Sequence, residues 1–158
     1  MDVTLRPVDQ ANRSAVEALQ VSPAQHDYVA GVSESIVEAA ETPQAMPWYR
    51  AIYAGDEPVG FVMISDNIPP GDPQLLGPYF LWRLLVDQKQ QGHGYGAAAV
   101  QLVVEYLRDR PGATELLTSV VPGPGCPIGF YLRQGFYPTG QVFGGELVLT
   151  LPLAIGPG

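Results

Sequence analysis

The sequence is poor in residues on which several classes of protein depend. Its single cysteine, Cys126, cannot form a disulfide within the chain. Together with the only two histidines, His26 and His93, it offers too few ligands for a typical zinc site, so we expect no bound metal. No apolar run approaches the ~20 residues of a membrane span, and the first residues lack a basic-then-apolar signal pattern. We therefore expect a soluble, cytoplasmic protein without membrane contacts.

Positive charge is also scarce. Eight basic residues stand against 16 acidic ones, the net charge is −8, and Lys89 is the only lysine. Proteins that bind the nucleic-acid backbone cluster Lys and Arg, so nucleic acid is not an expected partner. The acidic balance fits two roles. Either it steers a cationic substrate to the protein, or it only keeps the chain in solution.

Apolar residues, in contrast, make up 46% of the chain and recur with clear periods. Period-2 and continuous apolar runs predict strands, and apolar residues three and four apart predict amphipathic helices. The pattern predicts one α/β domain over residues 1–158 with about seven strands and no linker. Strands are expected at 3–8, 48–54, 59–65, 80–86, 116–121, 137–143 and 146–153, and helices at 15–19, 31–41, 97–107 and 128–132.

The most informative stretch joins the apolar strand at 80–86 to the helix at 97–107. Between them lies Gln-Gly-His-Gly-Tyr-Gly, residues 91–96. Alternating glycines permit left-handed backbone dihedrals and close approach of a ligand. The amides of the turn and of the first helical turn have no internal partner and lie at the positive end of the helix dipole. They are suited to hold a phosphate or pyrophosphate, and the alternative is a tight turn without a ligand.

Two other phosphate-binding motifs fit less well. Gly92-x-Gly94-x-x-Ala97 matches a loose dinucleotide fingerprint, but that motif follows the first strand of a βαβ unit, and here several strands precede it. The nucleotide P-loop is excluded because Ala97 stands where a Lys-Ser/Thr pair is needed.

The stretch resembles the acetyl-CoA motif of the GNAT acetyltransferase superfamily, Arg/Gln-x-x-Gly-x-Gly/Ala, through Gln91, Gly94 and Gly96. The resemblance implies acetyl-CoA as co-substrate and a mixed, largely antiparallel sheet that is splayed beside the cofactor. It implies pantetheine pairing with the backbone of a strand, in the manner of an added strand. The implied cofactor-binding residues are Leu84, Leu85, Val86, Gln91, Gly92, His93, Gly94, Tyr95, Gly96 and Ala97.

A second segment, Phe-Tyr-Leu-Arg-Gln-Gly-Phe at 130–136, resembles the Tyr-x-x-x-Gly-Phe segment late in the same family. There the tyrosine commonly lies near the CoA sulfur, so the resemblance implies that Tyr131 is the catalytic acid. The alternative is a tyrosine of the core. A phenol with a pKa near 10 is protonated at neutral pH and can donate to a departing thiolate. Upstream, residues 122–127 replace an Asn that many relatives carry, and Cys126 in this loop is given no role.

Acidic residues offer a site for a cationic acceptor. Glu34 and Glu38 are four apart on the helix expected at 31–41, so they share one face. That face is either solvated or a carboxylate row that receives an ammonium or a polyamine.

Tyr79, Trp82 and Asp66 complete the candidate site. Tyr79 and Trp82 are candidates to line a substrate channel, although core packing is the commoner role of such residues. The general base is left open between Glu34, Glu38 and Asp66.

Further segments, at 25–30, 51–63, 79–87 and 145–153, resemble the bacterial spermine/spermidine acetyltransferase branch of the family. The resemblance implies direct transfer of an acetyl group to a primary amine such as spermidine or spermine. Branch membership does not fix the substrate. An aminoglycoside-like antibiotic, an amino acid, a protein N-terminus, or acyl-CoA binding without catalysis stay open. Because many relatives pair, a homodimer is also a possible state.

Overall fold

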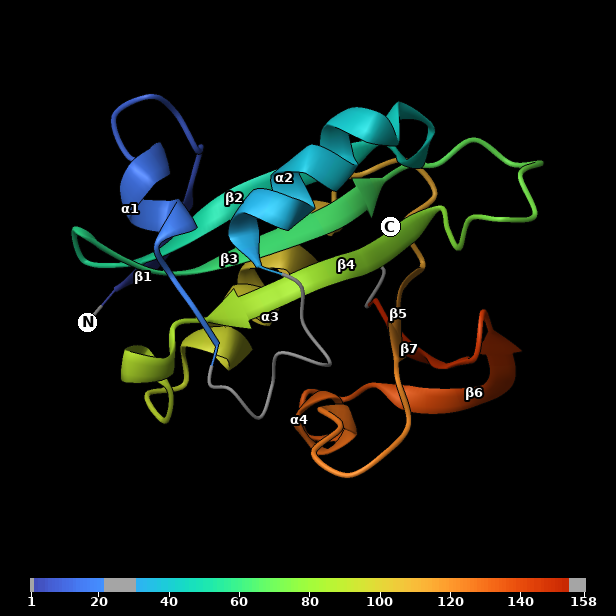
Figure 1. Ribbon diagram of the computed structural model, residues 1–158. Helices are drawn as coiled ribbons and strands as arrows, with labels where there is room; N and C mark the ends of the chain where they lie inside the picture. The colour runs from blue at the N-terminus through green and yellow to red at the C-terminus, as the bar shows by residue number, and fades with distance from the viewer. Residues whose placement is uncertain (1, 22–30, 154–158) are drawn as a thin grey trace.

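The computed structural model describes residues 2–21 and 31–153. Within them, strands form one seven-stranded sheet in the order β1-β2-β3-β4-β5-β7-β6 (Figure 1). Neighbouring strands are antiparallel except for β4 and β5, which are parallel, so the predicted mixed, largely antiparallel α/β architecture is confirmed. The strands are β1 (Val3–Arg6), β2 (Pro47–Ala54), β3 (Glu57–Asp66), β4 (Tyr79–Val86), β5 (Glu115–Val120), β6 (Tyr137–Phe143) and β7 (Glu146–Pro152).

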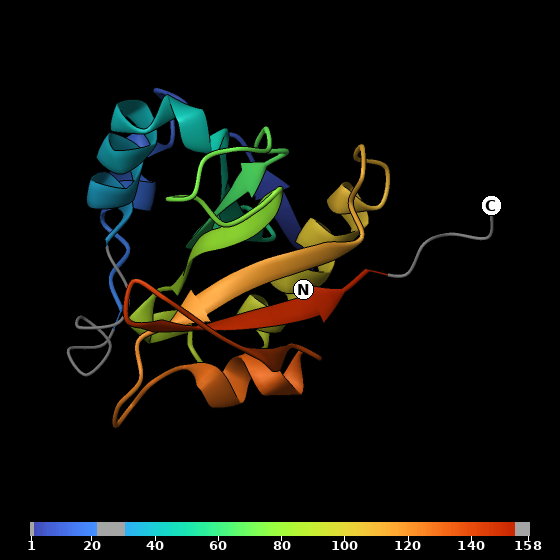
Figure 2. The ribbon, with the colours of Figure 1, turned by 90° about the vertical axis from the view of Figure 1, so that its right-hand side faces the viewer.

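Helices cover both faces of the sheet. In Figure 1, α1 (Arg13–Glu17) and α2 (Val32–Glu41) lie in front of β2, β3 and β4, whereas α3 (Tyr95–Leu107) lies behind them. Figure 2 shows α4 (Ile128–Arg133) against the half of the sheet that contains β6 and β7. Short 3-10 turns are η2 (Pro43–Ala45) and η3 (Gln88–Gln90).

The buried apolar residues fall into two clusters, one on each face of the sheet. The first joins the sheet to α3 and α4 and contains the apolar stripe of α3, with Val100, Val103, Val104 and Leu107 spaced three and four apart. The second lies between the sheet and α1 and α2, with Val16 and Ile36 from the helices. The alternation of apolar side chains across the sheet thus supplies both cores.

A β-bulge in β4 changes which side chains face which cluster. Arg83 pairs with Met63 and Leu81 pairs with Ile64, so Trp82 is an extra residue without an opposite partner. Before the bulge, Leu81 belongs to the α3 cluster, whereas after it Leu85 belongs to the α1/α2 cluster. An inserted residue shifts the period-2 pattern by one, so the later side chains exchange faces.

The sheet opens directly after this bulge. β4 and β5 pair only at Phe80↔Leu117 and Leu81↔Thr118. Beyond that point β4 stays with β3 as far as Val86, and β5 stays with β7 as far as Val120. The two parallel strands therefore part beside residues 82–86, which confirms the splayed sheet expected at the cofactor site.

Gly60 holds β3 close to the part of β4 that borders this opening. It pairs with Val86, and a Cβ on Gly60 would lie 2.3 Å from the backbone oxygen of Leu85. Because that oxygen belongs to the sheet, we expect Gly60→Ala to lower the free energy of unfolding by about 2–3 kcal/mol in urea titrations. Gly31→Ala is the control, since among the described residues its Cβ would have only the Glu34 carboxylate nearby, at 3.8 Å. Equal stability of the two variants would contradict the steric argument.

The elements match the predicted strands and helices, with shifts at their ends. The first strand ends at Arg6 rather than at residue 8, and the first helix is Arg13–Glu17 rather than 15–19. Gly144 and Gly145, with φ of 57° and 81°, form the turn between the predicted strands β6 and β7. The resembling segment 25–30 lies outside the described residues. In residues 2–21 and 31–153, no helix is long and apolar enough to cross a membrane.

Candidate active site

A pocket of about 770 Å³ lies where β4 and β5 part. Its wall comes from β4, from the end of β5, from the glycine-rich turn with the start of α3, and from the loop and helix at 125–134. The volume falls within the roughly 300–1,000 Å³ typical of small-molecule and cofactor sites. Ten of the predicted site residues line it: Trp82, Leu84, Val86, Gln91, Gly92, Gly94, Tyr95, Gly96, Ala97 and Tyr131.

The glycine-rich turn has the backbone that the sequence predicts. Gly92 and Gly94 have φ of 87° and 77°, and Gly94 is the N-cap of α3. A Cβ at either position would meet no described protein atom within 4 Å, and both glycines line the pocket. The first amides of α3 have no carbonyl one turn earlier within the helix. This combination suits an anionic group of the size of a diphosphate.

Gly96 serves a different purpose from the other two glycines. A Cβ there would lie 3.3 Å from two ring carbons of Phe130 and 3.6 Å from a methyl group of Val86. The missing side chain therefore lets the start of α3 pack against α4 and β4. This contact fixes the distance between the glycine turn and the helix that carries Tyr131.

Gln91 ties the turn to the strand that precedes it. Its side-chain amide donates a hydrogen bond of 3.1 Å to the backbone oxygen of Val86. The side chains of Leu85 and His93 lie elsewhere: Leu85 is buried in the α1/α2 cluster, and the His93 ring lies 5.5 Å from the ring of Tyr95. The resemblance implies that Leu85 and His93 contact acetyl-CoA through their backbone, and this contact stays a prediction.

Tyr131 lies in the wall of the pocket, in contact with the core. Its side chain is 8% exposed and meets Phe130 and Phe136 edge-on, with centroids 5.2 and 5.3 Å apart. Burial raises the pKa of Tyr131 to about 12, a hydrogen bond with Thr118 works in the opposite direction, and Cys126 adds a smaller upward contribution. The Thr118 hydroxyl donates a hydrogen bond of 3.1 Å to the Leu81 carbonyl, so Thr118 sits where β4 and β5 part.

The raised pKa predicts a contribution to stability at alkaline pH. Tyr131 ionises near pH 10 when unfolded and near 12 when folded, so its contribution is complete below pH 10 and is lost as pH rises toward 12. Between about pH 9 and 11 the wild type should lose about 1.4 kcal/mol more than Tyr131→Phe in urea unfolding. Burial also raises the pKa of Tyr79 and Tyr106. Both residues are present in the wild type and in the variant, so their contributions cancel in the difference between the two proteins. Parallel pH curves for the two proteins would contradict this assignment.

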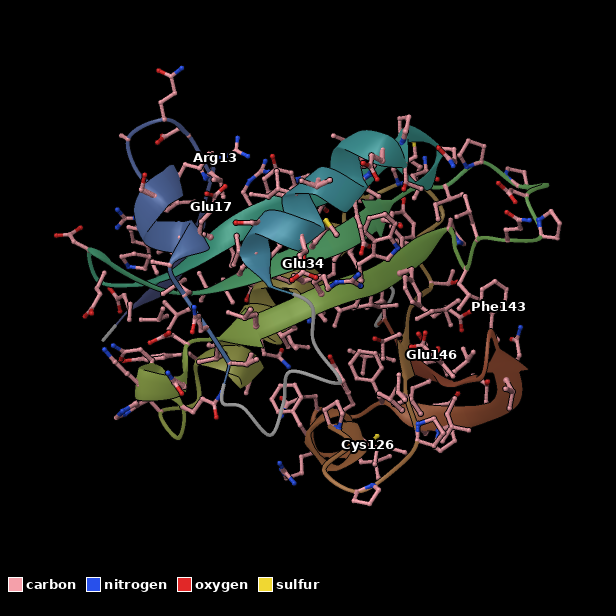
Figure 3. The ribbon with its side chains drawn as sticks, in the orientation of Figure 1. Arg13, Glu17, Glu34, Cys126, Phe143 and Glu146 are labelled. Carbon is pink, nitrogen blue, oxygen red and sulfur yellow. The ribbon has the colours of Figure 1, made fainter. Side chains whose placement is uncertain are left out.

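The two predicted carboxylates on α2 lie outside the pocket wall. Glu38 accepts a hydrogen bond of 2.7 Å from Arg83, whose side chain does line the pocket. Glu34 is exposed, one helical turn earlier on α2, and Figure 3 shows it in front of β4. α2 thus presents acidic groups beside the pocket, with one of them engaged by an arginine.

The structure places two other predicted residues away from the pocket. Tyr79 is fully buried and its hydroxyl donates to the Pro111 carbonyl at 2.5 Å, so we assign it to the core and not to a substrate channel. Tyr79 lies at the start of β4, before the point where β4 and β5 part. Asp66 accepts hydrogen bonds from Tyr106, at 2.5 Å, and from Arg110, at 2.9 Å. Asp66 therefore drops out as a general base, since it lies outside the pocket wall and is already engaged.

Sequence reasoning missed several polar residues in the pocket wall, among them Glu146 and Ser119. Glu146 begins β7, and Ser119 lies in β5; the serine hydroxyl donates to a Glu146 carboxylate oxygen at 3.1 Å. Both line the pocket. The two residues are 27 apart in the chain and no motif links them. Only the register of β5 with β7 brings them together.

Comparison with known proteins identifies the family. A model of the acetyltransferase (GNAT) family matches residues 6–136, and the chain belongs to this family. It is an acetyl-CoA-dependent N-acetyltransferase, with acetyl-CoA as co-substrate. The spermine/spermidine N(1)-acetyltransferase of Bacillus subtilis is 27% identical over 154 residues, which cover 97% of this chain and 100% of that protein.

Solved structures share the fold at lower identity. An acetyltransferase from Thermus thermophilus aligns with a TM-score of 0.71 and 21% identity over 97% of this chain and 98% of that one. Aminoglycoside acetyltransferase AAC(6')-Ib, crystallised with coenzyme A, aligns with a TM-score of 0.74 and 20% identity over 96% and 95% of the two chains. At this level of identity the likeness establishes the fold.

Proposed function

We propose that this enzyme transfers the acetyl group of acetyl-CoA to a primary amine of a polyamine such as spermidine or spermine. The observation that carries the proposal is the end-to-end relation, at 27% identity, to a protein named spermine/spermidine N(1)-acetyltransferase. The net charge of −8 supports a cationic acceptor, because an acidic surface attracts such a substrate over long range. The aminoglycoside acetyltransferases share only the fold at 20% identity, so they weigh less.

In this proposal the glycine-rich turn would hold the diphosphate of acetyl-CoA. The open, left-handed positions Gly92 and Gly94 and the free first-turn amides up to Ala97 support this role. The β5-facing edge of residues 84–86 has no strand partner among the described residues, so its backbone can pair with the pantetheine arm. Holding both reactants converts a bimolecular step into one within a complex, which lowers its entropic cost.

Tyr131 would act where the thioester is cleaved. The neutral amine attacks the thioester carbonyl carbon, and the carbon–sulfur bond then breaks with its electron pair left on sulfur. A hydroxyl whose pKa is about 12 stays protonated throughout the physiological range and can donate to the forming thiolate. Its place in the pocket wall, next to Thr118 at the opening of the sheet, supports this role.

The acceptor would approach from the α2 side of the sheet. Trp82 packs against the α1/α2 cluster and lines the pocket, so it marks that entrance. Glu34 and Glu38 would attract the distal ammonium groups of a polyamine, with Glu38 also fixing Arg83 in the pocket wall. A homodimer and a cytoplasmic location stay predictions from the sequence.

An acceptor panel tests the proposal. CoA release from acetyl-CoA is measured with spermidine, spermine, an aminoglycoside, free amino acids and a peptide with a free N-terminus, and products are identified by mass. The proposal expects the highest kcat/KM with a polyamine. Preferred turnover of another amine would reassign the acceptor, and CoA binding without turnover on any amine would indicate a binding module.

A further inference from the structure

The Ser119–Glu146 pair occupies the side of the pocket opposite Tyr131. Along β5, Val120 belongs to the α3/α4 cluster, and Thr118 is buried close enough to Tyr131 to affect the pKa of that phenol. Side chains alternate along a strand, so Ser119 projects to the other face, where α1 and α2 lie over the neighbouring half of the sheet. Glu146, labelled in Figure 3, joins Ser119 through their hydrogen bond. Thr118 and Ser119, which are consecutive in β5, are thus neighbours of Tyr131 and Glu146 respectively.

The charge of Glu146 is uncompensated by any described residue. Its described partner is the neutral Ser119 hydroxyl, and no Lys or Arg in the described ranges lies within 4 Å of its carboxylate. Glu38, in contrast, is paired with Arg83. A carboxylate has lone pairs for several donors, and Ser119 uses one of them. A partly buried, unpaired carboxylate in a pocket wall is suited to receive a cation.

We propose that Glu146 binds the reacting ammonium of the acceptor and takes its proton, while Ser119 holds the carboxylate in position. The proposal rests on the function proposed above and assigns the general base within that same site. It places proton removal and proton donation on opposite sides of β5. Acetyl-CoA would be held from the α3 side by the glycine turn, and the acceptor would meet the thioester from the side of Glu146.

Protons and electrons balance over the whole transfer. The Glu146 carboxylate takes one proton from the ammonium, R–NH₃⁺, and passes it to water. The freed lone pair forms the nitrogen–carbon bond, and the carbon–sulfur bond breaks with its electrons on sulfur. The Tyr131 hydroxyl gives its proton to the sulfur, and the second proton lost by the nitrogen restores that hydroxyl. The products are the amide R–NH–COCH₃, CoA thiol and one proton in solution.

Glu146→Gln is the test, because glutamine keeps the oxygen that Ser119 contacts and removes only the charge. With spermidine we expect kcat/KM to fall about 100-fold near pH 7, the lower range for loss of a general base. The variant must use amine that is already neutral, and alkyl ammonium groups have a pKa near 10.4. Its kcat/KM should therefore rise about tenfold per pH unit between about pH 7 and 9, whereas that of the wild type stays nearly flat.

Two variants control this result. Glu105→Gln removes the same charge from the exposed face of α3 and should leave kcat/KM unchanged. Ser119→Ala keeps the Glu146 carboxylate but removes its hydrogen bond. We expect kcat/KM to fall about 3–10-fold and to stay nearly constant with pH. Other ionisable groups that line the pocket are Arg83, Arg133, Tyr95, Tyr131 and Cys126; all are retained in every variant, so they contribute equally.

The outcomes separate the two proposals. If Glu146→Gln has the kcat/KM of the wild type, or if its kcat/KM is lower by the same factor at every pH, Glu146 is not the general base. The proposed function would still stand. Failure of the wild type to acetylate any amine overturns the proposed function and this role together. Unfolding temperature and CoA affinity, measured for each variant, establish that the fold and the cofactor site are intact.

Discussion

Replacing Tyr131 with phenylalanine is expected to lower kcat about 100-fold while acetyl-CoA affinity changes by less than about twofold. The ring keeps its contacts with Phe130 and Phe136, so the pocket wall and the core are preserved. What is lost is the hydroxyl that donates to the forming thiolate. Steady-state kinetics with spermidine, together with calorimetric titration of CoA, measure the two quantities separately.

Tyr137→Phe is the matched control, because this residue is 52% exposed on β6 and the substitution removes the same hydroxyl outside the pocket wall. Its kcat should equal that of the wild type. If Tyr131→Phe turns over as fast as the control, Tyr131 has no part in the chemistry and belongs only to the core.

Replacing Gly94 with aspartate should weaken CoA binding about 100-fold. Asp tolerates the left-handed conformation of this N-cap better than most residues, and its Cβ meets no described atom within 4 Å. The fold should therefore survive, with unfolding free energy within about 1 kcal/mol of the wild type. The new carboxylate faces the expected diphosphate, and repulsion of about 3 kcal/mol at short range in a partly screened site gives this factor.

Gly94→Asn separates charge from shape, since Asn has nearly the same size and the same tolerance of positive φ. We expect it to bind CoA at least tenfold more tightly than the aspartate variant does. Gly112→Asp adds the same charge at another left-handed glycine, after the end of α3, and should leave affinity unchanged. Equal affinities for Gly94→Asp and Gly94→Asn would mean that no anion lies at this turn.

The parts of the site that are local in sequence could be predicted from the sequence. The glycine turn and the start of α3 follow from a strand, alternating glycines and a helical period within one continuous stretch. Tyr131 follows from a short segment that ends at Gly135, whose φ of 103° closes α4. In both cases the residues that make the feature are close neighbours in the chain.

Features that depend on pairing between distant strands could not be predicted. The bulge at Trp82 is visible only in the register of β4 against β3, and it decides which cluster the later side chains of β4 face. Likewise Ser119 meets Glu146 only because β7 lies beside β5, inserted ahead of β6 in the sheet order. A one-residue shift in register would turn these side chains to the other face, and the sequence carries no local signal for it.

A crystal structure of the enzyme with CoA tests the central claim most directly. We expect the diphosphate on the backbone amides of residues 92–97, the pantetheine arm along the open edge of β4, and the sulfur within hydrogen-bonding reach of the Tyr131 hydroxyl. A diphosphate bound away from Gly94, or a sulfur distant from Tyr131, would contradict that claim.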